Sequence, residues 1–460
     1  MTASPALTPA ATTALDALPV AIIGAGPVGL AAAAQLLERG QEVVVFEAGD
    51  QAGASVAAWG HTRLFSPWEY LVDEAAARLL DEADWEAPPA KTLPTGQQLV
   101  DDYLLPLAAV PALADRIRYG HRVLAVTRRG MDRTRTLGRE LAPFVLRTES
   151  AAGVTETLAR AVIDASGTYE TSNAIGSSGL EPIGADQVRE HLSHALPDVL
   201  GGDRAQFAGK RVLVVGAGHS AANTLLKLAS LAKREPETQI FWAIRGKQPT
   251  RVYGSANDEL AARGELGGAT RALVTSGQVQ LLDQFEIDAL TPAEDGGVRV
   301  TGLRAGVAAT VDVNVIVNAT GFRPNLDLLR ELRLDLDTVV EAPRALAPLI
   351  DPNAHSCGTV YPHGVDELTH PEPGFYIAGM KSYGRAPTFL LLTGYEQVRS
   401  IADELAGHHE QARLVTLVLP ETGVCSTSTP EEGDGASCEA PTPVSAGGQE
   451  VTAPASGCCA

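Results

Sequence analysis

A pattern of strand, glycine-rich turn, helix and strand occurs twice in this chain and constrains its fold more than any other feature. The first copy is residues 20–47 (VAIIGAGPVGLAAAAQLLERGQEVVVFE), and the second is residues 211–245 (RVLVVGAGHSAANTLLKLASLAKREPETQIFWAIR). Each begins with a short β-branched run, which is typical of a buried parallel strand, and continues as a helix rich in Ala and Leu. The repeated pattern predicts an α/β fold with two Rossmann-like domains.

The first turn has the spacing Gly24-x-Gly26-x-x-Gly29. In this spacing the first glycine makes a tight turn, the second lets the backbone approach a pyrophosphate, and the third lets the helix pack on the strand. The N-terminus of the helix that follows offers unpaired N–H groups to the phosphates, and Pro27 is a further predicted contact there. Glu47, at the end of the second strand, is placed to accept hydrogen bonds from ribose hydroxyls.

The second turn has the spacing Gly216-x-Gly218-x-x-Ala221, in which alanine is an accepted small residue at the third position. Its second strand ends in Arg245 rather than in a carboxylate. A free 2′-hydroxyl needs an acceptor, whereas a 2′-phosphate favours Arg, so this copy predicts NADPH over NADH, the alternative being a surface Arg with no phosphate to bind. Because the two copies end in residues of opposite charge, they predict FAD at the first and NADPH at the second. The predicted contacts in the second turn are Gly216, Gly218, His219, Ser220 and Ala221.

Four further motifs follow: Ala165-Ser166-Gly167, Phe207-x-Gly209-Lys210, Ala319-Thr320-Gly321-Phe322 and the segment 374–379 (GFYIAG). With the two turns, over residues 19–415, they resemble flavoproteins that have two dinucleotide-binding domains. In particular, the chain resembles flavin-containing monooxygenase-like proteins, including flavin monooxygenases of actinobacterial arsenic-resistance operons.

The resemblance implies a discontinuous FAD domain, formed by residues 19–170 and 321–415, with an NADP domain of residues 171–320 inserted into it. It adds Gly167, Gly321, Gly379 and Met380 to the predicted FAD contacts. Met380 departs from the family pattern, which usually has Asp there. The fingerprint Phe-x-Gly-x-x-x-His of the best-known monooxygenases is also absent, since residues 180–194 read LEPIGADQVREHLSH.

Cysteine positions separate the candidate reactions. No cysteine pair occurs between residues 1 and 420, where Cys357 stands alone. A disulfide reductase of this superfamily would carry a dithiol beside the flavin, so its absence favours a reaction of reduced flavin with O2. A C4a-hydroperoxyflavin would then transfer oxygen to a small soft nucleophile, with an arsenic compound as one candidate. The flavin supplies the reactive group, so no catalytic triad is expected.

Four side chains are candidates for catalytic contacts at the flavin edge. His61 and Arg63 follow the FAD acid in a loop expected to pass the isoalloxazine, and Lys381 and Arg385 lie in the loop before a helix predicted over residues 388–405. The alternative for Lys381 and Arg385 is that they are solvated cations. Pro387 is expected in the first turn of that helix, where proline is favoured.

The two ends of the chain differ in composition from the rest. Residues 1–18 and the acidic segment 421–460, which has no Lys or Arg, predict disorder. The adjacent thiols of Cys458 and Cys459 suit a soft metalloid, which leaves two alternatives open. The chain would be an NADPH-dependent reductase that uses these thiols, either thioredoxin-reductase-like or acting on a metalloid, or a non-catalytic flavin redox sensor or metalloid-capture protein.

The formal net charge of −20 argues against nucleic acid as a partner. The first 19 residues lack a signal-peptide pattern, and the apolar run 20–37 is interrupted by glycines and a proline, so we expect a cytoplasmic protein with no membrane span. The spacing of His355, Cys357, His363 and His370 matches no standard zinc site. The expected partners are a small-molecule substrate and O2, and the oligomeric state, a homodimer included, is left open.

Overall fold

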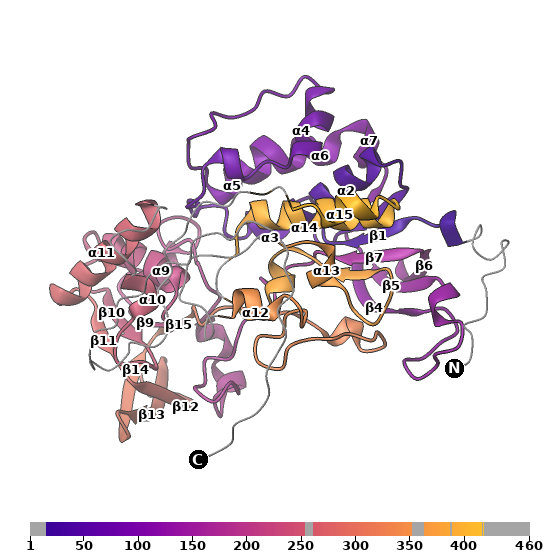
Figure 1. Ribbon diagram of the computed structural model, residues 1–460. Coiled ribbons are helices and arrows are strands. Elements are labelled where there is room, and N and C mark those ends of the chain that lie inside the picture. The colour runs from indigo at the N-terminus through magenta and orange to yellow at the C-terminus, as the bar shows by residue number, and fades with distance from the viewer. Residues whose placement is uncertain (1–14, 254–260, 352–362, 387–388, 416, 418–460) are drawn as a thin grey trace, which may run out of the picture. The chain divides into compact units, whose positions relative to one another are not determined.

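The computed structural model describes residues 15–253, 261–351, 363–386, 389–415 and 417 (Figure 1). The predicted disorder of residues 421–460 and of nearly all of residues 1–18 therefore concerns segments outside the described residues, as do all five cysteines. Within the described residues, no helix has the length and apolar character needed to cross a bilayer.

The first of two parallel sheets is formed by strands from distant parts of the chain. Its order is β16-β7-β1-β2-β3. Its strands are β1 (Val20–Ile23), β2 (Val43–Phe46), β3 (Ile117–Arg118), β7 (Ala161–Asp164) and β16 (Phe375–Ile377). Each residue of β1, β2 and β7 is buried, as expected for the β-branched runs of a sheet covered on both faces.

The second parallel sheet lies in sequence between β7 and β16, and its order is β11-β10-β9-β15-β8. Its strands are β8 (Leu192–Ser193), β9 (Arg211–Val215), β10 (Gln239–Ala243), β11 (Gln280–Leu282) and β15 (Val315–Asn318). The first sheet is thus completed by a strand that follows the whole second sheet. The α/β fold with two Rossmann-like sheets, predicted from the repeated pattern, is confirmed.

Two antiparallel three-stranded sheets accompany the parallel ones. One is formed by β4 (Arg122–Arg128), β5 (Phe144–Ser150) and β6 (Gly153–Ala159), and the other by β12 (Phe285–Pro292), β13 (Val298–Arg304) and β14 (Val307–Val313). The longer helices are α2 (Pro27–Glu38), α4 (Glu74–Asp81), α9 (His219–Ala232), α11 (Ala261–Thr275) and α14 (Leu391–Leu405). The shorter ones are α3 (Ala54–Ala57), α5 (Gly96–Leu99), α6 (Leu105–Ala109), α7 (Pro111–Ala114), α8 (Arg204–Phe207), α10 (Thr250–Tyr253), α12 (Ala347–Ile350), α13 (Val365–Leu368) and α15 (His409–Arg413). The 3₁₀ segments are η1 (Trp68–Tyr70), η3 (Arg139–Leu141), η4 (Ala185–His191), η5 (Asp327–Leu329) and η6 (Gly379–Tyr383), and η2 (Val100–Leu104) is a π-helical turn.

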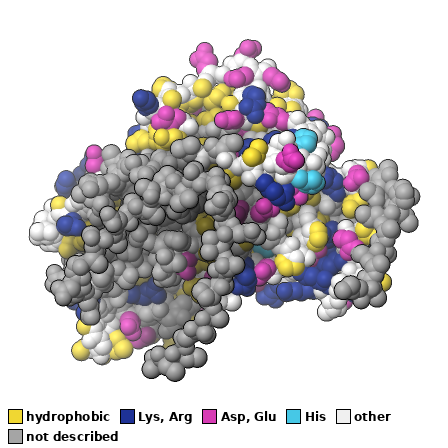
Figure 2. Space-filling model, in the orientation of Figure 1, with side chains coloured by type: hydrophobic (Ala, Val, Ile, Leu, Met, Phe, Trp, Pro, Cys, Tyr) yellow, Lys and Arg dark blue, Asp and Glu magenta, His cyan; other side chains and the backbone are white. Residues whose placement is uncertain are grey.

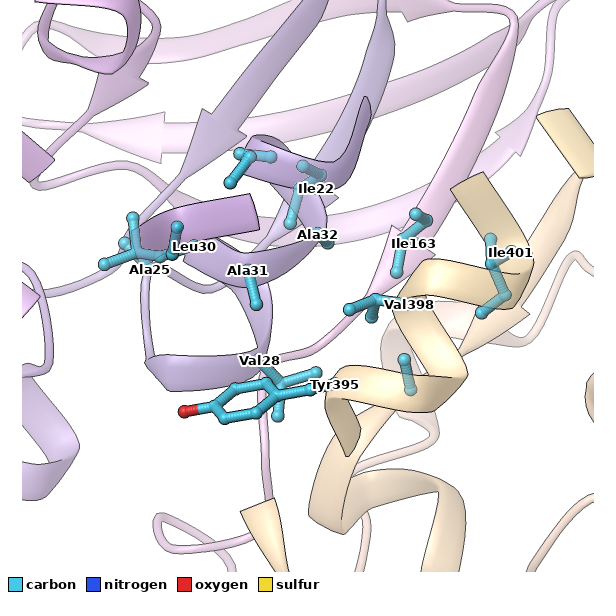
Figure 3. Close-up of a cluster of buried hydrophobic side chains, with 14 of the residues drawn as sticks. Ile22, Ala25, Val28, Leu30, Ala31, Ala32, Ile163, Tyr395, Val398 and Ile401 are labelled. Carbon is cyan, nitrogen blue, oxygen red and sulfur yellow. The ribbon is translucent and has the colours of Figure 1, made fainter. Parts of the chain in front are cut away.

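Helices α2 and α14 pack closely against each other over the first sheet (Figure 3). The contact uses small residues, because a Cβ added at Gly394 would lie 2.7 Å from Cγ2 of Val28. Ala31 and Ala32 are fully buried on the α2 side. α14 begins at Leu391 rather than at residue 388, because Leu390 is extended, with φ −112° and ψ 139°. Pro387, which was expected in the first helical turn, lies outside the described residues.

A buried charged cluster attaches the β4–β5–β6 sheet to the loop before β16. Arg128 Nε donates to Oε1 of Glu372 at 2.8 Å, and Arg139 Nη2 donates to Oε2 at 2.8 Å. The guanidinium of Arg128 also lies 3.5 Å from the ring centroid of Phe144. All three charged side chains are at most 4% exposed. On the face drawn in Figure 2, acidic and basic side chains are interspersed over the described surface.

A second buried polar group lies behind α2, at the start of α4. Asp73 is 3% exposed. Its Oδ1 accepts from the Ala76 backbone N–H at 3.0 Å as a helix cap, and its Oδ2 accepts from Nε2 of Gln35 at 2.9 Å. Its own N–H donates to the Tyr103 hydroxyl at 3.1 Å. Burial raises the pKa of Asp73 to about 6, although these hydrogen bonds favour the carboxylate.

Asp73→Asn is expected to remove a pH dependence of stability between about pH 4 and pH 6. Because the folded state holds the proton more tightly than the unfolded state, wild type loses stability as pH rises through about 6, by roughly 3 kcal/mol in total. Asn keeps the capping oxygen. In urea unfolding across pH 4–8, the free energy of unfolding of the variant should therefore rise relative to that of wild type as the pH increases. Parallel profiles would contradict the assignment.

Candidate functional site

The first glycine turn connects β1 to α2, and its three glycines have different surroundings. Gly24 has φ +99°, and a Cβ there would lie 2.8 Å from the carbonyl oxygen of Ala165. A Cβ at Gly29 would lie 1.9 Å from the carbonyl oxygen of Gly24, so this residue permits helix and turn to touch. At Gly26, by contrast, no described atom lies within 4 Å of where a Cβ would be. The turn is therefore closed on the protein side and open at its middle glycine.

The open side of this turn has the polarity of an anion site. α2 begins with Pro27 at its first turn, and no described side chain caps its N-terminus or places an acid in its first turn. Its first N–H groups and the positive end of its dipole thus face the space beside Gly26. Glu47 lies beside the turn, because its Oε2 accepts from the Ala25 N–H at 2.7 Å and its Oε1 accepts from the Gly49 N–H at 2.8 Å.

Two other turns meet the first at the carboxyl edge of the sheet. β7 runs into Ala165-Ser166-Gly167, and the close approach of Gly24 to Ala165 places that turn beside the first. β16 runs into η6, where the Ala378 N–H donates to the carbonyl oxygen of Asp164 at 3.0 Å. A Cβ at Gly379 would lie 3.2 Å from the side chain of Val28 on α2. The structure thus brings together Gly24, Gly26, Pro27, Gly29, Glu47, Gly167, Gly379 and Met380.

Lys381, predicted as a flavin-edge cation, lies instead in a buried ion pair. Its Nζ donates to Oδ2 of Asp164 at 2.7 Å and to Oγ of Ser166 at 3.0 Å. Both charged side chains have no exposed surface. The sequence-based alternative of a solvated cation is wrong, and a direct catalytic contact does not fit a side chain whose ammonium is held beneath the turns. Asp164 was missed by the sequence analysis.

A second buried network holds the turn that contains Gly379. The Gly379 N–H donates to Oε1 of Gln397 on α14 at 2.8 Å. Nε2 of Gln397 in turn donates to Oγ of Ser382 at 2.9 Å and lies 2.8 Å from Nε2 of His363. Gln397 and Ser382 have no exposed surface, and His363 is 1% exposed. Gln397, which lies 18 residues after Gly379, was also missed, since no motif signals it.

The second glycine turn, between β9 and α9, repeats the design of the first. Gly216 has φ +129°, and a Cβ there would lie 2.1 Å from the carbonyl oxygen of Ala319. At Gly218 no described atom lies within 4 Å of a Cβ position, and no described side chain caps α9. Ala221 is fully buried against the sheet. The buried indole of Trp242 donates from Nε1 to the Gly216 carbonyl at 2.7 Å, a support that sequence reasoning missed.

We call the parts of the chain that carry the first and the second parallel sheet the first half and the second half. The remaining predicted residues of the second half lie around its glycine turn. His219 and Ser220 form the first turn of α9. Arg245 is exposed just after β10, and its Nη1 donates to the carbonyl oxygen of Ser177 at 3.2 Å. Gly321, with φ +95°, lies in the crossover after β15, and its carbonyl accepts from the Asn173 N–H at 2.9 Å. Gly321 therefore joins the connection between the sheets rather than the first turn.

The other three catalytic candidates, His61, Arg63 and Arg385, differ in burial and in their partners. Burial lowers the pKa of His61, and the nearby Lys227 ammonium on α9 lowers it further. The His61 Nε2 is buried, with no hydrogen-bond partner among the described residues. In the same loop, Arg63 is exposed and donates to the Leu93 carbonyl. Arg385 pairs at the surface with Glu341, its Nε 2.7 Å from Oε2.

The loop that contains His61 reaches the second half of the molecule. Phe65 packs with the hydrophobic cluster of the second sheet. Its ring meets that of His219 edge-on, with centroids 5.6 Å apart. Part of the loop predicted to pass the flavin thus contacts the second glycine turn. Cys458 and Cys459, the candidate metalloid ligands, lie outside the described residues.

Residues 21–357 match the family described as pyridine nucleotide-disulphide oxidoreductase. The chain belongs to this family. Membership confirms the predictions of a flavoprotein with two dinucleotide-binding domains and of an FAD- and NAD(P)-dependent oxidoreductase. No curated protein sequence matches the chain.

Solved structures share the fold of this oxidoreductase at low sequence identity. Bacillithiol disulfide reductase from Bacillus cereus matches with a TM-score of 0.63 and 20% identity, covering 85% of this chain and 99% of that one. A cadaverine monooxygenase of desferrioxamine biosynthesis from Erwinia amylovora matches with a TM-score of 0.61 and 14% identity, covering 90% and 99%. A flavin monooxygenase from Stenotrophomonas maltophilia matches with a TM-score of 0.55 and 20% identity, covering 85% and 98%.

Proposed function

We propose that this oxidoreductase is an NADPH-dependent flavin monooxygenase that oxygenates a small soft nucleophile. The observation that carries the proposal is the paired geometry of Gly26 and Gly218. Each leaves open space at the uncapped start of a helix, at the carboxyl edge of its own parallel sheet. Ligands of open α/β sheets bind at that edge, so the chain offers two separate dinucleotide sites.

The first site fits FAD. The space beside Gly26 and the start of α2 would receive the pyrophosphate, and Glu47 would accept from ribose hydroxyls with the lone pairs that Ala25 and Gly49 leave free. The turns at Gly167 and Gly379 face the same edge. Met380 offers no carboxylate, so we assign the flavin side of the site to backbone groups rather than to an acid.

The second site fits NADPH. Gly218, His219 and Ser220 would hold the pyrophosphate at the start of α9. Arg245 has its guanidinium exposed at the end of β10, where the 2′-phosphate of the adenosine would lie in this fold. A guanidinium binds a phosphate through two parallel hydrogen bonds, and the free 2′-hydroxyl of NADH cannot form this pair of bonds.

The chemistry that FAD supplies when bound is hydride acceptance from the nicotinamide and a reaction of the reduced ring with O2. The chain itself binds and orients the two nucleotides, and the buried network at Gln397 keeps one flavin-site turn in place. The first 356 residues contain no cysteine, so a dithiol relay between the two turns is absent from the sequence. For this reason we propose O2 rather than a disulfide as the electron acceptor.

Stopped-flow reoxidation tests this choice. After anaerobic reduction by NADPH, the enzyme should be reoxidised rapidly by O2, and release of H2O2 should lag behind if oxygen is held for transfer. Bacillithiol disulfide, glutathione disulfide and oxidised thioredoxin, mixed anaerobically, should leave it reduced. Reoxidation by any disulfide faster than by O2 would instead establish the reductase.

The reductase is the second candidate, because the chain has the fold of a bacillithiol disulfide reductase and ends in adjacent cysteines. Deletion of residues 421–460 separates the two: a reductase that uses Cys458 and Cys459 would lose its acceptor activity, whereas the monooxygenase would keep O2 consumption.

Arsenite and methylarsenite are the first soft nucleophiles to screen by NADPH consumption, since they bind thiols and are readily oxygenated.

A further inference from the structure

The crossover turns of the two halves have the same side-chain design. In the first half, Oδ1 of Asp164 accepts from the Ser166 N–H at 3.1 Å and from its hydroxyl at 2.7 Å. In the second half, Oδ1 of Asn318 accepts from the Thr320 N–H at 3.3 Å and from its hydroxyl at 2.6 Å. Both residues end a central strand of their sheet and form the same local turn with the residue two positions on.

The two turns differ in the hydrogen-bond partner of the second terminal atom of that side chain, which is Oδ2 in Asp164 and Nδ2 in Asn318. Nδ2 of Asn318 donates to the carbonyl oxygen of Asn173 at 2.9 Å, so the neutral amide completes its own hydrogen bonding with backbone. Oδ2 of Asp164 is an acceptor in the same place and receives the Lys381 ammonium at 2.7 Å. The turn itself therefore does not require a charge, and the buried carboxylate needs a cation that a neutral amide would make unnecessary.

The position of Lys381 explains what the charged version adds. Lys381 lies two residues after Gly379, in the turn that follows β16, whereas Asp164 precedes Gly167 in the turn that follows β7. The ammonium also donates to the Ser166 hydroxyl at 3.0 Å, so it contacts the last residue of β7 and the middle residue of the turn that follows. A buried ion pair is weak support for stability, since apolar replacements are often equally stable, but here it holds the ends of two paired strands, β7 and β16, in side-chain contact.

We propose that Lys381 and Asp164 are positioning residues that tether the two flavin-site turns, so that affinity for FAD depends on their contact. This inference rests on the proposed FAD site at the first glycine turn. The tether acts through hydrogen bonding across the turns, and a neutral pair that keeps this bond will keep FAD.

Two double variants that differ at a single position isolate the tether. In both, Asp164→Asn keeps the local turn and removes the buried negative charge. With Lys381→Gln added, the side-chain amides can still bond across the turns, and the FAD dissociation constant should stay within about threefold of wild type. With Lys381→Met added, the bond is lost and the dissociation constant should rise by about tenfold or more. Flavin fluorescence quenching on titration of the apoprotein measures both.

The unfolding midpoint of each apoprotein, measured in parallel, separates positioning from folding. We expect similar midpoints without FAD and a smaller FAD-induced rise for the Lys381→Met combination. Equal FAD affinity of the two double variants would overturn the proposal, and a combination that fails to fold would assign the pair to stability and overturn it as well. Asn318→Ala, in the matching turn, should leave FAD affinity unchanged. If wild type itself bound no FAD, the proposed function would fail before this comparison could begin.

Discussion

Gly26→Val is expected to give a folded protein that no longer retains FAD. Gly26 has φ −79° and ψ −175°, a conformation that valine adopts without strain, and no described atom lies within 4 Å of its Cβ position. The branched side chain would occupy the space assigned to the pyrophosphate. Overpacking of this kind costs about 3 kcal/mol, or roughly a hundredfold in the dissociation constant. The visible absorbance of the purified protein measures the retained FAD, and the unfolding midpoint of the apo form shows whether the variant is folded.

Gly218→Val is the matched control in the second half. Gly218 is extended, with φ −114° and ψ 178°, and its Cβ position is equally open. This variant should keep its flavin and its colour but lose NADPH binding, so that flavin reduction by NADPH slows while dithionite reduction is unchanged. If both variants kept stoichiometric flavin, or both lost it, the assignment of one nucleotide to each turn would be wrong.

Arg245→Ala is expected to lower kcat/KM for NADPH by about 10- to 100-fold and to leave kcat/KM for NADH nearly unchanged. The expected loss is that of a charge-assisted contact with the 2′-phosphate, worth about 1.5–3 kcal/mol. Its guanidinium is exposed and has only the Ser177 carbonyl as its hydrogen-bond acceptor among the described residues. Removing it should therefore disturb the fold little.

The control for Arg245 is Arg299→Ala, which removes an exposed arginine that is paired with Asp312 on β13–β14. Both nucleotides should react with this variant as with wild type. An equal drop for NADPH and NADH in Arg245→Ala would show that Arg245 supports the turn rather than the phosphate, and NADPH preference would then have to come from elsewhere in the half.

Local patterns in the sequence predicted the parts of the structure that depend on neighbouring residues. The two strand–turn–helix units appear where the spacing places them, because the glycines, the β-branched runs and the apolar helices act within a few residues. The shared turn design at Asp164 and Asn318 was readable in the same way, as acid or amide, alanine, hydroxyl residue and glycine. The two motifs were recognised from the alanine onward, and the Asp and Asn that precede them were left out.

Contacts between distant segments could not be read from local patterns. Lys381 was taken for a flavin-edge cation, since nothing near it in sequence shows that Asp164 awaits it 217 residues away. Gln397 is one of several polar residues on α14, and only the fold selects it as the acceptor for Gly379. The loop at His61 was expected at the flavin, but the contact of Phe65 with His219 could be seen only once the two sheets were built.

The dependence of Asp164 on Lys381 also orders events on the ribosome. Asp164 emerges with β7, yet its cation, along with β16, is synthesised only after the entire second sheet has left the exit tunnel. Until then the nascent chain must leave this carboxylate hydrated, because burying it alone is costly. The second sheet can therefore fold before the first is complete, and we expect FAD to bind only after β16 has joined its sheet.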